Sequence, residues 1–161
     1  MSVVVVTDSS ACLPAELRDR WGIRTVPLHI LLDGADLRDG VDDVPDDVYL
    51  RERVTTAGAA PEDLAEAYRT ALEHSAGSGV VAVHISAALS GTVATAGHAA
   101  QQLGPAVQVV DSKSAAMGTG FVALAAARAA AGGADLHQVA AEADAAVRRG
   151  HAYTEVQRLA N

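Results

Sequence analysis

Three short polar segments hold the side chains of this sequence that could bind or transform a small molecule. They span residues 7–10, 86–92 and 111–114, and each directly follows an apolar run rich in valine. Such runs predict buried strands, and an open parallel sheet binds its ligands beyond the carboxyl ends of its strands. We therefore expect the three segments to lie together at one edge of a sheet.

The segment 86–92 has the composition of an anion-binding site. Ser86, Ser90 and Thr92 supply hydroxyl groups, and Gly91 lets the backbone approach a ligand closely. The segment leads into a predicted helix, whose free N–H groups and positive dipole end attract negative charge. Ser90 can also act as a cap of that helix, and the two roles are compatible.

Asp8 and Asp111 are the candidates for acid/base chemistry. Each follows a predicted strand and precedes a serine, which is also the pattern of an aspartate that ties down its own loop. An enzyme acting on a small phosphorylated or carboxylated substrate would need one of them in a compact polar pocket with a perturbed pKa. The loop-tying role needs no such pocket.

The histidines and the cysteine add no further candidate. The six histidines have no partners at the spacing of a metal site or a catalytic triad. His84 lies inside a predicted strand, so we expect a core residue with its hydrogen bonds satisfied. Cys12 has no histidine nearby and is expected to be a small packed thiol. We predict no catalytic residue, no metal and no cofactor.

The elements that position these segments alternate between strands and helices. The patterns predict strands near residues 3–6, 24–32, 80–85 and 107–110, and helices near 14–21, 61–76, 91–103, 115–131 and 135–149. Residues 33–47 read as an acidic loop that leads into a short helix ending at Arg51. This order predicts an α/β fold with a mainly parallel sheet of about four strands and helices on both faces.

Composition narrows the class of protein. A chain of 161 residues with half of them apolar suits one domain. The formal net charge of −8 counts against nucleic acid, which is bound by clustered lysine and arginine. The start of the chain lacks the pattern of a signal peptide, and the apolar run 121–127 is too short to span a bilayer. We expect a soluble cytoplasmic protein.

Five motifs, in this order and spacing, resemble the N-terminal lobe of the DegV family of bacterial fatty-acid-binding proteins. They are VVTDSSACLP, WGIRTVPLHI, TTAGAAPEDL, ISAALSGT and VVDSKSAAMGTG. The resemblance implies an α/β lobe that holds one long-chain fatty acid in a tunnel, with hydroxyl groups binding the carboxylate. It also implies a possible partner, a fatty acid kinase that phosphorylates the presented carboxylate.

The family's carboxylate-binding motifs are only partly kept. The family's Thr-Ser-Gln-Pro falls on residues 56–59, where only Thr56 matches. The second Ser of its Ser-Ser-x-Leu-Ser-Gly-Thr motif is Ala87 here, and one lost bond to a charged group costs roughly 1.5–3 kcal/mol. The expected ligand-binding residues are those that remain, with a fatty acid as ligand. They are Thr56, Ser86, Ser90, Gly91 and Thr92.

The resemblance also predicts how the chain is organised. Residues 1–150 match one lobe, and residues 151–161 are expected to form the start of a second lobe or a tail. Family members are near twice as long, and their second lobe supplies the other tunnel wall. A lobe alone would expose apolar tunnel wall, which favours pairing into a homodimer. The leading hypothesis is a non-enzymatic binding lobe; the alternatives are a degenerate interaction lobe and an enzyme using Asp8 or Asp111.

Overall fold

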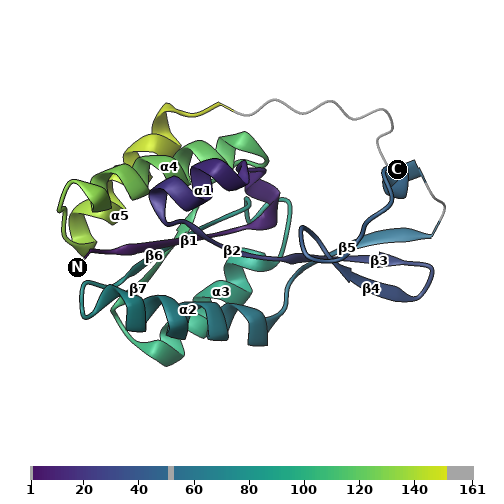
Figure 1. Ribbon diagram of the computed structural model, residues 1–161, viewed down its shortest axis with the longest axis horizontal. Helices are drawn as coiled ribbons and strands as arrows, with labels where there is room; N and C mark the ends of the chain where they lie inside the picture. The colour runs from purple at the N-terminus through teal and green to yellow at the C-terminus, as the bar shows by residue number, and fades with distance from the viewer. Residues whose placement is uncertain (1, 51–52, 152–161) are drawn as a thin grey trace.

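A computed structural model describes residues 2–50 and 53–151. In this part of the chain, two layers of helices enclose one sheet, and a second, smaller sheet projects from their edge (Figure 1). The strands are β1 (Val4–Asp8), β2 (Arg24–Val26), β3 (Leu28–Leu32), β4 (Ala35–Arg38), β5 (Val54–Ala59), β6 (Val80–His84) and β7 (Val107–Asp111). The α-helices are α1 (Ala15–Trp21), α2 (Pro61–Ser75), α3 (Thr92–Leu103), α4 (Met117–Ala131) and α5 (Leu136–Arg149), and the 3-10 helices are η1 (Ser9–Ala11) and η2 (Val48–Leu50).

The larger sheet is parallel throughout and has the strand order β2-β1-β6-β7. Helices α1, α4 and α5 cover one face, and α2 and α3 cover the other (Figure 1). This arrangement confirms the predicted α/β fold with a parallel sheet of four strands. All four strands end at the same edge, so the loops that follow β1, β6 and β7 lie close together, as the sequence predicts.

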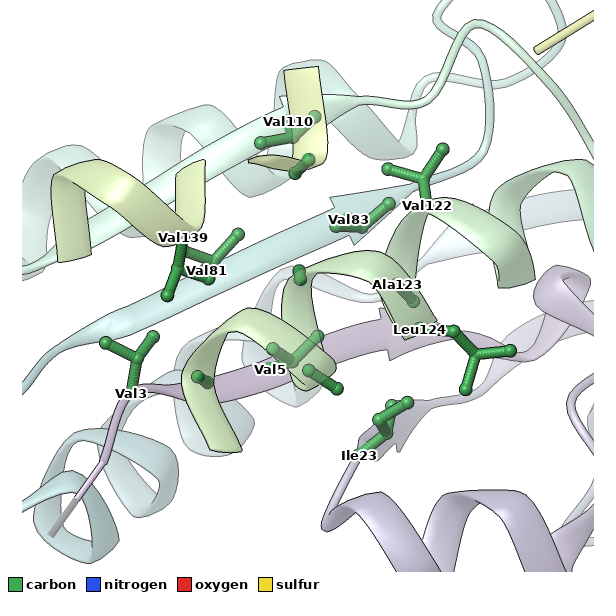
Figure 2. Packing of buried hydrophobic residues seen from close by; sticks show 14 of the residues in the cluster. Val3, Val5, Ile23, Val81, Val83, Val110, Val122, Ala123, Leu124 and Val139 are labelled. Carbon is green, nitrogen blue, oxygen red and sulfur yellow. The ribbon is translucent and has the colours of Figure 1, made fainter. Parts of the chain in front are cut away.

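Alternation along the strands divides the core between the two faces. Val5, Val81 and Val83 point toward α4 and α5 (Figure 2), whereas Val6 and Ala82 pack against α2 and α3. This is the two-residue period of a strand buried on both sides. The helix residues that pack against the sheet are mostly alanine, with Leu64 and Tyr68 of α2 as the largest fully buried exceptions.

The predicted strand 24–32 is in fact two strands that belong to different sheets. Pro27 separates β2 from β3, because proline cannot donate a ladder hydrogen bond. Strand β3 then pairs antiparallel with β4 and β5 to form the smaller sheet. Its small core contains Ile30, Leu32 and Val48.

The acidic stretch 33–47 and the segment 54–59 hold strands that the sequence analysis did not predict. Asp33 and Gly34 both have positive φ values, of 51° and 84°, and they join Leu32 to its partner Ala35. This is the geometry of a two-residue hairpin, and the Asp-Gly pair was the signal for it. The predicted short helix appears as η2, and its expected end at Arg51 lies outside the described residues.

The helix boundaries agree with the predicted ones within two residues. Asp135 and Gln138 form the predicted capping box of α5.

Cys12 differs from expectation, since it is exposed rather than packed. Residues 152–161, where a tail or second lobe was expected, lie outside the described part. No helix within residues 2–50 and 53–151 is long and apolar enough to cross a membrane.

Candidate functional site

A cavity of about 480 Å³ lies where the two sheets meet, at the carboxyl ends of β1 and β6. One wall comes from β3 and β5, and the other from the loops after β1 and β6. Its apolar lining is Leu28, Ile30, Ile85 and Leu89. Its polar lining includes Ser9, Ser10, His29, Asp39, Thr56 and Ser90. This volume lies in the range of small-molecule sites, roughly 300–1,000 Å³.

Three of the five residues that the sequence analysis expects to bind a ligand line this cavity: Thr56, Ser90 and Gly91. Thr56 lies on β5 opposite Ile30 and is exposed. Gly91 precedes the first residue of the twelve-residue helix α3, so the positive end of the helix dipole faces the cavity. The Thr56 hydroxyl on one wall and the Ser90 hydroxyl beside the helix N-terminus on the other therefore border the same space, which is a suitable arrangement for a carboxylate.

Thr92 is buried and does not line the cavity. Its Oγ1 accepts a hydrogen bond from the Ala59 N–H at 3.3 Å and lies 2.8 Å from Ser90 Oγ. Ser90 Oγ also accepts from the Thr92 N–H at 3.2 Å, which satisfies a free amide at the start of α3. Thr92 thus fastens the start of α3 to β5 and positions Ser90.

Gly58 makes this contact possible. A Cβ atom on Gly58 would lie only 2.9 Å from Thr92 Oγ1. Gly58 also lines the cavity, so the absence of a side chain keeps β5 and α3 close together at the point where Thr56 and Ser90 face the same space.

Ser86 lies beside the cavity rather than in its lining. It is 8% exposed, and its Oγ accepts a hydrogen bond from the Ala88 N–H at 3.2 Å. The neighbouring Ala87 N–H donates to Asp111 Oδ1 at 3.3 Å, and the Lys113 N–H donates to the same oxygen at 2.9 Å. Asp111 therefore ties two loops together, in agreement with its simpler predicted role.

Asp8 belongs to a fully buried polar chain. Asp8 Oδ2 lies 3.0 Å from His84 Nδ1, and His84 Nε2 lies 2.6 Å from the Tyr68 hydroxyl. The Ile85 N–H donates to Asp8 Oδ2 at 2.9 Å, and the Ser10 N–H and hydroxyl both donate to Oδ1. His84 is thus the satisfied core residue that its place in a strand predicted.

The pKa values agree with a structural role for this chain. Burial by itself would raise the pKa of Asp8, but the hydrogen bonds and charge of His84, together with Ser10 and Ile85, outweigh it and lower that pKa. Burial, followed by the Asp8 charge, raises the pKa of Tyr68. Asp8 is therefore held as an anion whose oxygens are already occupied, and it is not poised to exchange protons with a ligand.

His29 is a cavity residue that the sequence analysis did not identify. Its Nδ1 lies 2.6 Å from Asp36 Oδ1, and its Nε2 lies 3.2 Å from Asp63 Oδ2. The hydrogen bond to Asp36 is the main reason that the pKa of His29 is raised, with Asp63 adding to it. These partners lie 7 and 34 residues away along the chain, so no local spacing could indicate them.

No group of three or more His, Cys, Asp or Glu side chains within the described ranges is arranged to hold a metal ion. The cavity thus offers hydroxyl groups, a helix N-terminus and apolar surface, which together suit an amphipathic molecule with one anionic end.

Comparison with known proteins identifies a family over nearly the whole chain. The family described as "Uncharacterised protein, DegV family" matches residues 2–161. A DegV domain-containing protein of Mycobacterium tuberculosis is 63% identical over 161 residues, which are 100% of this chain and 57% of that protein. One from Streptomyces coelicolor is 38% identical, over 98% of this chain and 57% of its own length. The chain therefore spans little more than half the length of these relatives.

Solved structures show the same fold. A DegV family protein from Thermus thermophilus, described by its fatty acid binding, is 40% identical with a TM-score of 0.83, over 92% of this chain and 54% of that one. DegV from Bacillus subtilis, described as a fatty acid binding protein, is 26% identical with a TM-score of 0.79, over 92% of this chain and 54% of that one.

Proposed function

The chain belongs to the DegV family, and from this premise we propose that it is a lobe that binds a long-chain fatty acid by its carboxylate. The observation that supports this most directly is the cavity between the two sheets, which joins apolar walls to a cluster of hydroxyl groups. The structures from Thermus thermophilus and Bacillus subtilis, both described as fatty acid binding, support the same ligand class.

Within this proposal the five expected site residues take different parts. Thr56 and Ser90 donate hydroxyl hydrogen bonds to the carboxylate, while Gly91 leaves the N-terminus of α3 open to it. Thr92 and Ser86 do not contact the carboxylate in this proposal. Each side chain instead holds a helix end or a loop in place. The acyl chain lies against Leu28, Ile30 and Leu89.

The lobe acts in this proposal as a carrier and not as a catalyst. Asp8 is occupied by His84, Ser10 and Ile85, and Asp111 is occupied by two backbone N–H groups. Thr56 is exposed and Ser90 is half-buried, so a carboxylate held there stays within reach of another protein. This accessibility supports presentation to a fatty acid kinase, the partner that the family resemblance implies.

The test is the affinity for palmitate of three single variants, measured by titration calorimetry. Ser90→Ala and Thr56→Val each remove one hydroxyl from the cavity, and we expect each to weaken binding by about tenfold, as loss of one bond to a charged group implies. Thr55→Val is the matched control, because Thr55 is the exposed neighbour of Thr56 on β5 and does not line the cavity. Equal affinity in all three variants and the unaltered chain would contradict the proposed head-group site.

A further inference from the structure

A second, smaller cavity of about 190 Å³ lies on the other side of the turn formed by η1. It is bounded by the carboxyl ends of β1 and β2 and by α1, with Gly40 and Val41 at its exposed side. The two cavities share three lining residues, Ser9, Cys12 and Asp39. The smaller one is therefore a neighbour of the proposed fatty-acid site.

Three buried polar atoms lack a hydrogen-bond partner in the described part of the chain, and all three belong to residues that line this small cavity. They are Thr7 Oγ1, Thr25 Oγ1 and Arg18 Nε. Thr7 lies opposite Thr25 in the parallel pairing of β1 and β2, so the two side chains stand next to each other on one face of the sheet.

The chemistry of these atoms specifies the occupant. Buried polar groups in proteins are almost always hydrogen-bonded, to protein, ordered water or a ligand. Arg18 Nε can only donate, and both threonine hydroxyls can donate. Arg18 also has no ion pair within the described residues, which leaves its positive charge available. An occupant with several acceptor oxygens and a negative charge fits this set best.

The acidic residues beside the cavity do not cancel this preference. The oxygens of Asp8 already accept hydrogen bonds from Ser10, His84 and Ile85. Asp39 is half-buried and lies near the exposed Val41, where solvent screens its charge.

We propose that Thr7, Arg18 and Thr25 form a binding site for a small free oxyanion, separate from the site of the fatty-acid carboxylate. The site takes one polyatomic anion, whose oxygens accept hydrogen bonds from the two hydroxyls and from the Arg18 guanidinium. Inorganic phosphate is the probe with which we test it.

The first experiment measures phosphate binding to the 161-residue chain by phosphorus-31 NMR in a buffer without other oxyanions. We expect saturable binding at one site, weakened at least tenfold in Arg18→Gln. Arg20→Gln is the matched control, because Arg20 lies on the same helix, stacks over Trp21 and lines neither cavity; it should bind phosphate as the unaltered chain does. Absence of saturable binding, or equal binding by Arg18→Gln, would overturn the proposal.

Thr7→Val and Thr25→Val keep the proposal testable if Arg18→Gln loses phosphate binding because it fails to fold. Each replaces an unpartnered hydroxyl with a methyl group of similar shape, so we expect an unchanged or higher melting temperature without phosphate. Each should also weaken phosphate binding and reduce the rise in melting temperature that phosphate produces. If both variants bind phosphate as tightly as the unaltered chain, the hydroxyls hold only water and the oxyanion site is wrong.

A final experiment tests whether the small cavity binds a free oxyanion or the carboxylate of the fatty acid. Phosphate is titrated into the chain with and without bound palmitate, whose own affinity is measured independently. Unchanged phosphate affinity in the presence of palmitate supports a separate site for a free oxyanion. Competition between the two would show that the small cavity takes the carboxylate itself, and the proposal of a second site would fall while fatty-acid binding stood.

Discussion

Asp8 carries a buried negative charge at the end of β1, surrounded by donors from three directions. The lowered pKa of this carboxylate means that the folded state holds its proton less tightly than the unfolded state does. The stabilisation is therefore present above the unfolded-state pKa, near 3.8, and is lost as the pH falls through the lower folded-state pKa.

Asp8→Asn should lower the free energy of unfolding at pH 7 by about 3 kcal/mol, because it removes a buried charged acceptor of hydrogen bonds from Ser10, His84 and Ile85. Urea denaturation measures the change. The difference between the variant and the unaltered chain should shrink as the pH falls below 3.8. Asp111→Asn, at a partly exposed loop contact, is the comparison and should cost less than about 1.5 kcal/mol. An Asp8→Asn variant as stable as the unaltered chain would refute the structural role of the buried chain.

Gly58 has no room for a side chain beside Thr92. Gly58→Ala places a Cβ 2.9 Å from Thr92 Oγ1, so we expect a loss of about 1–3 kcal/mol of stability and weaker palmitate binding as α3 shifts from β5. Gly97→Ala is the control, because a Cβ there meets nothing within 4 Å. On helix α3, that substitution should stabilise by roughly 0.5–1 kcal/mol. Thermal unfolding and calorimetry test both, and tolerance of Gly58→Ala in both assays would contradict the positioning role of Thr92.

At the scale of elements, the smaller sheet is joined to the helical layer through His29. This side chain on β3 bridges Asp36 on β4 and Asp63 on α2. A separate ion pair joins Arg38, at the end of β4, to Asp42 in the turn that follows. The raised pKa of His29 means that the bridge stabilises the fold fully below the unfolded-state pKa near 6.5. The contribution is lost as the pH rises through the higher folded-state pKa.

His29→Gln should therefore destabilise the fold at pH 6, with the difference from the unaltered chain decreasing at higher pH. Hydrogen exchange at the amides of β3, β4 and β5, followed from pH 6 to 9, measures the effect where it arises. His137→Gln is the control, since His137 is exposed on α5 and makes no hydrogen bond or ion pair with the other described residues; it should not change the exchange of these amides. A pH-independent effect of His29→Gln would argue against an ionic bridge.

The elements also show which strands could be predicted from the sequence and which could not. Valine-rich runs predicted β1 and β6, because a strand covered on both faces is apolar throughout. The run 107–110 predicted β7 as well, although Gln108 is exposed on this edge strand. Strands β4 and β5 were missed, because their half-exposed faces carry Ala, Asp, Thr and Gly; only Asp33-Gly34 pointed to the hairpin. The loops of the site were predicted from the residues, and Thr56 was predicted from the family resemblance. The pairing of β3 with β5, and with it the place of His29 in the cavity wall, was not predicted.

At the scale of the whole molecule, the cavity has one apolar side open to solvent. Leu89 lines it and is 58% exposed. An acyl chain that covers Leu89 would remove this surface from water. Pairing with a second copy, which the family resemblance predicts for a single lobe, would cover apolar surface in the same way and stays a prediction.

Leu89→Ser should weaken palmitate binding by about fivefold, because it removes roughly 1 kcal/mol of apolar burial. Leu50→Ser is the matched control: Leu50 is 88% exposed and does not line the cavity, so its affinity for palmitate should not change. Fluorescence competition with a labelled fatty acid gives both values. A similar affinity for the two variants would place the acyl chain elsewhere.

The central claim is that this lobe holds a fatty acid. Native mass spectrometry of the freshly purified chain, followed by lipid extraction under denaturing conditions, tests it most directly. The structure predicts one fatty acid per chain, either carried through purification or taken up when palmitate is added. A chain that is purified empty and also fails to take up added palmitate would contradict the claim, and the cavity between the sheets would then belong to a lobe without ligand.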